Sequence, residues 1–543
     1  MGRVTRAVNR VNQRVSLSMA ASLLAGSTLV SALLGFYRDK LLNSTYYYTY
    51  PQGIDAYTVA FIIPDFMFYI LVSGALSVTF IPVFNARLGK GNKQSAWRLS
   101  ASMMNLMALA TLVASILIIV FAEPLVKYVV APGLDESATG LAVSMMRVIA
   151  VNPFLFAIAS VIASMQQAVG RFVFFALAPL IYNIGIIIGI VWFTGGLNLF
   201  GLQIFGGGIM GVALGVVLGS VLQLIVSSIG LIGMGFDYDF KIFWKNKGLR
   251  QVLRLLPARS LDQGIDYFNQ IVEVNLASRM FAGAVRAYQQ GLTLHMVPVT
   301  LIGVAISTAA FPSMTERLAQ NRPDLFKKEL QDILRVIVWL ALPVSAIAFF
   351  TRGYLVHFIF KNGAAVVSGI LGILVIAILF RSVYHIASRS FYAQQDTRTP
   401  LYISIFAIAL NITLAIWFTM GLGAGLYGLA WAQSIVAVVE VAILFFVMSF
   451  RINNLLDSPF LAAIFRMFMS TILMSIVTYL GVRTLNLMAT DVSFFATFPK
   501  FALIVLISFA AYLGLCRLFK LKEADLVVKK LERFALWEPK AKN

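Results

Sequence analysis

Long, uninterrupted runs of apolar residues recur along the whole chain, separated by short polar segments. A helix needs about 20 apolar residues to cross the hydrocarbon core of a bilayer, and these runs reach that length. They are too long and too continuous to be the alternating strands of a membrane β-barrel. The pattern predicts about fourteen transmembrane helices, over residues 16–42, 54–84, 97–122, 139–168, 172–196, 207–235, 251–282, 286–315, 329–351, 365–393, 400–422, 425–449, 459–482 and 497–518.

Composition supports this prediction. Of the 543 residues, 60% are apolar and only 12% are charged, and a soluble protein of this length needs more polar atoms to cover its surface. The single cysteine, Cys516, excludes a disulfide framework and a cysteine-based metal site. Four arginines precede the first apolar run, which is longer than the apolar segment of a signal peptide, so we expect an uncleaved membrane anchor.

Basic residues are concentrated in alternate loops, which predicts the sidedness of the chain. The net charge of +20 could indicate nucleic-acid binding, but the loops 194–206 and 421–426 contain no Lys or Arg at all. This positive-inside pattern predicts that both termini are cytoplasmic, and we expect no nucleic-acid partner. The basic tail 519–543 also carries apolar residues, and we expect it to form an amphipathic helix on the anionic inner leaflet.

The two halves of the chain carry similar polar landmarks at similar spacing. Two adjacent glutamines are followed by an arginine and, at the same offset in each half, by an asparagine: Gln166, Gln167, Arg171 and Asn183, then Gln394, Gln395, Arg398 and Asn411. Further matching landmarks are Gly74, Pro82 and Arg87 in the first half and Gly303, Pro312 and Arg317 in the second. Six spans per repeat return the chain to the same side of the membrane, so we expect parallel repeats with the substrate between them.

This duplication gives the predicted domain organisation. We expect an all-α integral membrane protein with two parallel six-helix lobes and two further C-terminal helices. The predicted segments are a basic N-terminus (1–15), an N-lobe (16–236), a basic loop (237–250), a C-lobe (251–450), the two extra helices (459–518) and the basic tail (519–543).

Three basic residues are stacked on one predicted helix of the C-lobe. Arg381, His385 and Arg389, which we call the basic column, follow each other at intervals of four residues and therefore share one helix face. Charges inside a membrane cost at least about 2.5–3.5 kcal/mol each and usually face a cavity or a partner. The column could form a cationic wall for a phosphate-bearing substrate, because guanidinium groups bind phosphate oxygens bidentately. It could instead be neutralised by carboxylates of neighbouring helices, with Arg389 at the inner interface.

A group of acidic residues lies in the run 251–282. Asp262, Asp266 and Glu273 share a face by their spacing, and they could pair with the basic column or bind a coupling cation or proton. Arg147 and Glu440 are isolated charges within other predicted spans, and we interpret Arg147 as a candidate cavity residue.

Three further charged residues, Arg38, Asp39 and Asp55, lie near the outer ends of the first two runs. A pair between Arg38 and Asp55 could act as an outer gate, or it could be a simple interfacial ion pair.

Glycines recur at four-residue intervals in the sixth run, at Gly211, Gly215 and Gly219. Small residues at this spacing let helix backbones approach each other, so we predict close helix packing here.

No catalytic motif is present. The chain lacks both the GxxxxGK[ST] phosphate loop and the HExxH metal motif, and its three histidines are scattered. We therefore expect no enzyme activity, no metal site and no cofactor.

Several short motifs stand out from the apolar background. Residues 391–400 read FYAQQDTRTP, residues 34–39 read LGFYRD, and residues 55–57 read DAY. Ala131-Pro132-Gly133 and Leu340-Ala341-Leu342-Pro343 follow in order. Over roughly residues 16–450, the chain resembles the MurJ/MviN family of lipid II flippases, in the multidrug/oligosaccharidyl-lipid/polysaccharide exporter superfamily.

The resemblance implies a fourteen-helix fold whose last two helices form a groove for a polyprenyl tail. It implies that the chain flips undecaprenyl-diphosphate-linked peptidoglycan precursor, lipid II, from the inner to the outer leaflet of the bacterial cytoplasmic membrane by alternating access. The membrane potential or a Na⁺ or H⁺ gradient would drive transport, and cell-wall synthesis proteins are candidate partners. Arg38, Asp39 and Asp55 match functional positions of the family.

The chain departs from the family where basic residues often line the anionic-substrate cavity. The positions concerned hold Ala32, Phe68, Tyr69 and Thr293 in this chain. Our hypothesis is that the basic column supplies the missing positive charge from another helix.

Three functions remain open from the sequence. A flippase of lipid II or of another polyprenyl-linked glycan requires a cationic cavity and two extra helices. A cation-coupled exporter of small amphipathic drugs requires an acidic or neutral cavity. In a non-transporting scaffold paralogue, the intramembrane charges would be dispensable. The basic residues within predicted spans favour the first function over the second.

Overall fold

The computed structural model describes residues 12–13, 17–73, 80–199, 202–205, 207–360, 364–488, 491 and 494–524. Within these ranges, the side chains at 17–18, 20–21, 73, 197–199, 202–205, 255–263 and 265 are not described. Most of the predicted basic N-terminus and most of the predicted amphipathic tail lie outside the described residues. The chain divides into two compact units, Met1–Arg286 (unit 1) and Ala287–Asn543 (unit 2).

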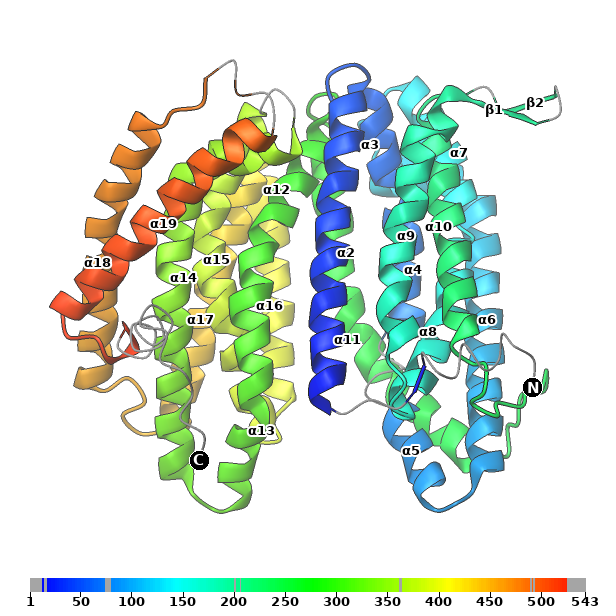
Figure 1. Ribbon diagram of the computed structural model, residues 1–543, viewed down its shortest axis with the longest axis horizontal. Helices are drawn as coiled ribbons and strands as arrows, with labels where there is room; N and C mark the ends of the chain where they lie inside the picture. Colours follow the sequence, from blue (N-terminus) through cyan, green and yellow to red (C-terminus); the bar gives the residue numbers. More distant parts are fainter. Residues whose placement is uncertain are drawn as a thin grey trace, which may run out of the picture. The chain divides into compact units, whose positions relative to one another are not determined.

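Unit 1 consists of helices that pack along one another, with α9 and α10 side by side (Figure 1). Short π-helical segments (η1 and η3) and a 3₁₀ turn (η4) extend three of these helices. The elements are α2 (Leu17–Tyr46), α3 (Pro51–Ala60), α4 (Ile62–Phe68), η1 (Tyr69–Ser73), α5 (Ile81–Gly89), α6 (Lys93–Pro124), η3 (Leu125–Val130), α7 (Glu136–Ile149), α8 (Asn152–Ala168), α9 (Val173–Val191), η4 (Phe193–Gly195), β1 (Leu197–Leu199), β2 (Leu202–Phe205), α10 (Met210–Ile229) and α11 (Lys247–Ser278).

Unit 2 begins within α12 and is also helical. The last two helices, α18 and α19, pack against each other and against α14 (Figure 1). The elements are α12 (Ala284–Pro298), η5 (Val299–Val304), α13 (Ala305–Ala319), α14 (Pro323–Ile359), α15 (Ala365–Ala393), α16 (Arg398–Ile416), η6 (Trp417–Gly421), α17 (Gly425–Arg451), α18 (Ser458–Thr484) and α19 (Phe494–Leu518).

The predicted all-α membrane fold is confirmed. Among the described residues, twelve helical segments are long and apolar enough to cross a membrane. The first and seventh predicted runs coincide with the long helices α2 and α11, which are not among those twelve. The segment 194–206, predicted as a loop, contains the short antiparallel hairpin of β1 and β2.

The same turn joins helices at corresponding places in the two units. Between α5 and α6, the N–H of Asn92 donates to the carbonyl oxygen of Arg87 at 3.1 Å, and the preceding glycine has a φ of 74°. Between α13 and α14, the N–H of Arg322 donates to the carbonyl oxygen of Arg317 at 3.0 Å, and the preceding asparagine has a φ of 55°. Glycine and asparagine tolerate this left-handed conformation best, and it closes many helix C-termini. The matching turns support the predicted duplication.

Glycines let α9 and α10 approach each other closely. A Cβ built on Gly189 would lie 2.6 Å from the Cα of Gly215, and Gly185 meets Gly219 more closely still. No larger side chain fits at such a distance, because ordinary van der Waals contact between carbon atoms begins near about 3.5 Å. The predicted close packing of the ridge Gly211, Gly215 and Gly219 is confirmed, since a Cβ on Gly211 would also lie 2.5 Å from the backbone of Phe193, in η4 at the end of α9.

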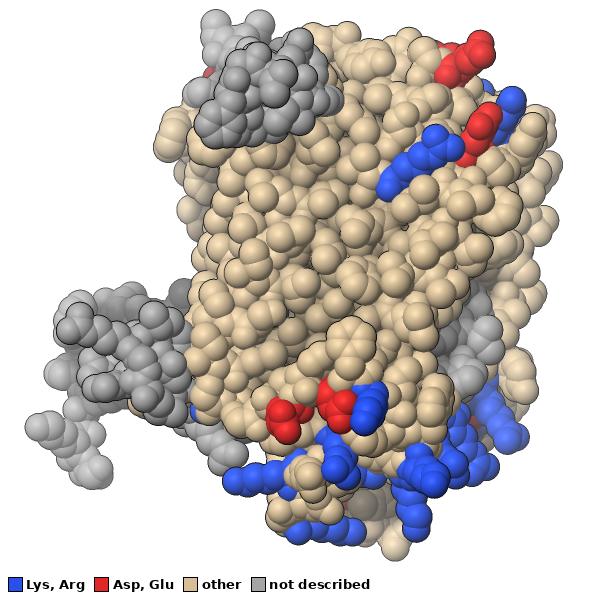
Figure 2. Space-filling view, turned by 90° about the vertical axis from the view of Figure 1, so that its right-hand side faces the viewer, with Lys and Arg blue, Asp and Glu red and all other residues tan. Residues whose placement is uncertain are grey.

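Basic residues of unit 1 gather at one end, below a broad band without charged side chains (Figure 2). The segment before α11 contacts α5 and α6 at this end, since Nη2 of Arg87 donates to Oδ1 of Asn246 at 3.3 Å, and Arg98 lies over the ring of Phe243 at 5.1 Å. An uncharged band between charged ends is what a bilayer requires of a surface that faces its hydrocarbon.

We expect Gly189→Ala to destabilise unit 1, because the new methyl group would overlap the backbone of α10 at Gly215. Overpacking of this kind typically costs about 1–3 kcal/mol. Gly26→Ala is the matched control, since nothing lies within 4 Å of a Cβ at Gly26 and alanine is the better helix former. Thermal unfolding of the purified variants in detergent measures both effects. Equal melting temperatures for the two variants would contradict the close contact.

Candidate functional site

Asp39 lies between two arginines in unit 1. Arg38 donates from Nε and Nη2 to Oδ1 of Asp39 at 3.2 and 3.1 Å, and Arg286 donates from Nη2 to the same oxygen at 3.2 Å. Asp39 and Arg286 are only 7% and 5% exposed. Two guanidinium groups share one carboxylate, so this group of three side chains keeps a net positive charge in a buried position.

Two asparagines accept hydrogen bonds from other donors of the guanidinium groups. Nε of Arg286 donates to Oδ1 of Asn43 at 2.8 Å, and Nη1 of Arg38 donates to Oδ1 of Asn183 at 3.0 Å. Asp39 and Asn43 are one turn apart on α2, so the helix presents both oxygens to the same arginine. The resulting network connects α2, α9 and the first turn of α12, which belongs to unit 1.

Asp55 of α3 caps the N-terminus of α12. Its Oδ2 accepts the N–H of Gly283 at 2.7 Å, and its Oδ1 accepts the N–H of Arg286 at 2.8 Å. The carboxylate satisfies amide groups that have no partner within the helix, and its negative charge is favourable at a helix N-terminus. The interpretation of Arg38 and Asp55 as a direct pair is therefore wrong, because the ion pair of Arg38 is with Asp39.

Sequence reasoning missed Arg286 and Asn43. Arg286 is a charge at the start of a predicted span, and the cost of burying it could have singled it out. Asn43 follows Asp39 at a helical interval, so a partner shared by both was also foreseeable. The contact itself was not, because more than two hundred residues separate Arg286 from α2.

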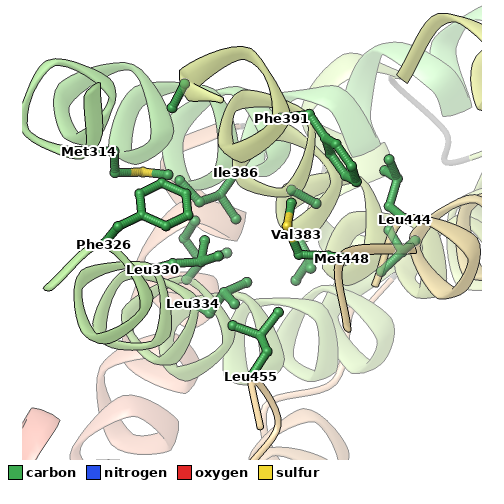
Figure 3. Packing of buried hydrophobic residues seen from close by; sticks show 14 of the residues in the cluster. Met314, Phe326, Leu330, Leu334, Val383, Ile386, Phe391, Leu444, Met448 and Leu455 are labelled. Atoms are coloured by element: carbon green, nitrogen blue, oxygen red, sulfur yellow. The ribbon is translucent and has the colours of Figure 1, made fainter. Parts of the chain in front are cut away.

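In unit 2, α15 holds the basic column on the side opposite to an apolar core. Figure 3 shows Val383 and Ile386 of α15 among buried side chains of α14 and α17. At about 100° per residue, Arg381, His385 and Arg389 then lie on the other side of the helix. All three side chains are partly buried. The core therefore fixes the rotation of α15 and with it the direction of the column.

Arg381 forms an ion pair with α17. Its Nη1 donates to Oε2 of Glu440 at 2.9 Å, and its Nη2 donates to Oε1 of Gln433 at 3.3 Å. Glu440 is 3% exposed, and its other oxygen accepts the hydroxyl of Ser404 at 3.1 Å. The interpretation of Glu440 as an isolated charge is wrong. For Arg381, neutralisation by a neighbouring carboxylate is what the structure shows.

The other two members of the column have no carboxylate partner among the described residues. The ring of His385 packs edge-on against Tyr384, with the ring centroids 5.7 Å apart. Arg389 is partly buried near the end of α15. This face of α15 therefore carries one paired arginine, one histidine and one arginine without an ion pair in the described part of the chain.

The acidic residues of α11 occupy different environments. Glu273 is buried, and its Oε1 accepts the Nδ2 of Asn269 at 3.0 Å. Asp266 is exposed, and the side chain of Asp262 lies outside those that the structure describes. Their roles in pairing or ion coupling stay predictions.

Arg147 lies at the surface of unit 1. Its side chain is exposed on α7, and its Nε donates to the carbonyl oxygen of Ile119 on α6 at 3.2 Å. It lines a surface hollow together with residues of α6 and η3. A role in substrate binding stays a prediction.

Aromatic rings fill two positions at which the resembled family often carries basic residues. Tyr69 stacks on Tyr267 of α11, with the ring centroids 4.4 Å apart, and Phe68 packs edge-on against Phe156 at 5.7 Å. At a third position, the hydroxyl of Thr293 donates to the carbonyl oxygen of Gln289 within its own helix. These positions make local packing contacts and contribute no charge.

The QDTRTP loop has a structural role. The carboxylate of Asp396 accepts the N–H groups of Arg398 and Thr399 at 2.9 and 3.0 Å, and Arg451 of α17 donates to it at 2.6 Å. Burial raises the pKa of Asp396, but the hydrogen bonds from Thr399 and Arg451 outweigh it and lower that pKa to about 2. The carboxylate is therefore ionised at neutral pH, where it caps α16 and ties it to α17.

Comparison with known proteins adds a family match to this geometry. A family model described as "Lipid II flippase MurJ" matches residues 52–498. A protein of Thermotoga maritima named "Probable lipid II flippase MurJ" is 25% identical over 418 residues, which cover 75% of this chain and 80% of that protein. A protein of the same name from Rhizobium tropici is 22% identical over 522 residues, covering 94% and 95% of the two chains.

Solved structures share the fold. A structure titled "Lipid II flippase MurJ, inward closed conformation" matches with a TM-score of 0.73 at 23% identity, covering 93% of this chain and 99% of that chain. An inward-facing multidrug resistance transporter of the MATE family matches with a TM-score of 0.65 at 15% identity, covering 84% and 99% of the two chains. At these identities, the structural likeness concerns the fold alone.

We expect Asp39→Asn to destabilise unit 1 by about 3–5 kcal/mol, because it leaves two guanidinium groups without their shared counter-charge. Combining it with Arg286→Gln should cost less than the sum of the single changes, since the two side chains share one contact. Asp324→Asn is the control, because its pair with Arg322 is about half exposed and such pairs contribute about 0–1 kcal/mol. Unfolding of each variant in detergent gives the values. Strict additivity would contradict the coupling.

Proposed function

Because the chain belongs to the lipid II flippase MurJ family, we propose that it moves lipid II, an undecaprenyl-diphosphate-linked peptidoglycan precursor, from the inner to the outer leaflet. The family match over most of the chain is the observation that carries this proposal. The chain is a multi-pass membrane transporter rather than an enzyme.

The diphosphate of such a lipid is the group that the basic column suits. Guanidinium groups bind phosphate oxygens through paired hydrogen bonds, and these bonds are stronger where water is scarce. Arg389 has no carboxylate partner among the described side chains, and His385 lies one turn away from it. The alternative function, a cation-coupled exporter of small amphipathic drugs, requires an acidic or neutral cavity, and the positive charge on this face of α15 does not favour it.

Glu440 gives Arg381 a counter-charge while no substrate is bound. An approaching phosphate would compete with Glu440 for the guanidinium group, whose Nη1 lies 2.9 Å from the carboxylate. Because one anion replaces another, Arg381 can bind and release the substrate while its positive charge always has a negative partner in the membrane. The pair thus supports reversible binding, which a transporter needs.

The remaining parts of the proposal concern the transport cycle and its direction. We propose alternating access in the bacterial cytoplasmic membrane, with both termini in the cytoplasm, coupled to the membrane potential or to a Na⁺ or H⁺ gradient. The basic loops at one end of unit 1 support this orientation. Glu273 is the candidate coupling acid, because it is buried within α11. Cell-wall synthesis proteins remain candidate partners.

We expect the triple variant Arg381→Gln, His385→Gln and Arg389→Gln to flip lipid II at least about tenfold more slowly, since each lost charged hydrogen bond is worth about 1.5–3 kcal/mol. A leaflet assay for lipid-linked precursor, in cells depleted of the wild-type protein, measures the rate.

Arg352→Gln is the matched control for this variant. Arg352 lies on α14 of the same unit, over the ring of Phe349 at 4.6 Å, and is not part of the column. It should support flipping at the wild-type rate. Full activity of the triple variant at normal abundance would rule out the column as the diphosphate site.

The orientation has its own test. In a Cys516→Ala background, a membrane-impermeant maleimide added to intact cells should label Ser137→Cys but not Lys90→Cys. The two exposed positions lie beyond opposite ends of the long helix formed by α6 and η3, and the native cysteine is buried. Lysed cells should give labelling at both positions. Labelling of Lys90→Cys alone in intact cells would reverse the proposed sidedness.

A further inference from the structure

A hollow on the surface of unit 1 is lined by charges of both signs. It has a volume of about 570 Å³ and lies between α6, η3 and α7. Its charged lining residues are Glu123, Lys127, Glu136 and Arg147, and all four are exposed. None of them forms an ion pair within the described part of the chain. Two acids and two bases thus face one open space without neutralising each other in direct pairs.

The hollow lies at the level of lipid headgroups. Arg147 contacts α6 at Ile119, which is about 39 Å along the helix from Lys93 at 1.5 Å per residue. The hydrocarbon core of a bilayer is only about 30 Å thick. With the basic end of α6 in one headgroup region, Arg147 falls close to the other. Figure 2 shows basic and acidic side chains near one another at this upper end, above the uncharged band.

The surface that leads from the hollow toward the membrane centre is apolar. Leu112, Ile116 and Val120 recur at four-residue intervals on α6 and are 41%, 51% and 61% exposed. They form a stripe along one helix face. A ligand with a charged head in the hollow could therefore lay acyl chains along this stripe.

We propose that the hollow binds the headgroup of an aminophospholipid such as phosphatidylethanolamine. Its phosphate pairs with Arg147 and Lys127, and its ammonium pairs with Glu123 and Glu136. Such a headgroup carries both signs, so it complements both pairs of side chains at once. The anionic headgroup of phosphatidylglycerol could pair only with the basic side chains of Arg147 and Lys127. The quaternary ammonium of phosphatidylcholine has no N–H to donate to the acids.

The wall of the hollow is attached to α11. The N–H of Gly133 donates to Oγ of Ser278 at 3.2 Å, and Nδ2 of Asn275 donates to the carbonyl oxygen of Val129 at 2.7 Å. A lipid that orders the segment between η3 and α7 would therefore also stabilise its contact with α11. Binding should raise the melting temperature as well as occupy the site.

Native mass spectrometry of the full chain, with each of the three lipids added in detergent, tests the proposal. We expect the wild type to retain phosphatidylethanolamine about fivefold to tenfold more than the other two lipids, as one or two partly exposed charged hydrogen bonds would give. The double variant Glu123→Gln and Glu136→Gln should lose the preference over phosphatidylglycerol. The double variant Lys127→Gln and Arg147→Gln should retain less phosphatidylethanolamine and less phosphatidylglycerol than the wild type.

Arg98→Gln is the control for general loss of charge, because Arg98 lies at the basic end of the same helix. It should retain all three lipids like the wild type. Equal retention of the three lipids by the wild type would overturn the proposal without any variant, and so would an unchanged preference in the acid-to-amide variant. Neither result bears on flipping of lipid II.

Discussion

Hydrocarbon offers a buried charge neither water nor a counter-ion, and this constraint shapes both units. In unit 1, the carboxylate of Asp39 forms ion pairs with two arginines, and asparagine side chains accept hydrogen bonds from other guanidinium N–H groups. In unit 2, Arg381 forms an ion pair with Glu440, and the hydroxyl of Ser404 donates a hydrogen bond to the other carboxylate oxygen. In each case the helices are placed so that partners from distant parts of the sequence meet, because an isolated charge in the membrane would cost several kcal/mol.

The helices could be predicted from the sequence because their cause is local. A run of apolar residues long enough to cross a bilayer has to be helical, and each predicted run contains a helix. The shared face of the basic column and the glycine contact of α9 with α10 are also consequences of helical spacing. Partners could not be predicted in the same way. The contact of Asp55 with the start of α12 spans more than two hundred residues, and Glu440 looks isolated until α17 is known to lie beside α15.

The QDTRTP loop, the most specific of the motifs that resemble the family, has a structural role. The carboxylate of Asp396 accepts hydrogen bonds from the start of α16 and from Arg451 of α17, so it stabilises the turn between α15 and α16. Under the proposed function, the diphosphate of the substrate is recognised by positively charged side chains. Rings occupy two positions where related proteins often carry bases, and Tyr69 is committed to stacking on Tyr267. Charge in this chain is correspondingly found on α15. The residues that identify the family are thus different from those at which we propose the substrate site.

The two charged networks differ in how easily they can exchange partners. Asp39 is held by several charged hydrogen bonds at once, so a ligand that displaced it would have to replace two guanidinium contacts in a buried place. Arg381 makes one charged contact, and its side chain is 28% exposed. A phosphate can therefore replace Glu440 at a smaller cost, and Glu440 keeps the hydroxyl of Ser404 when it is displaced. By this argument the network of unit 1 exchanges partners less easily than the pair of unit 2, which is why we propose α15 as the place where an anion binds and leaves.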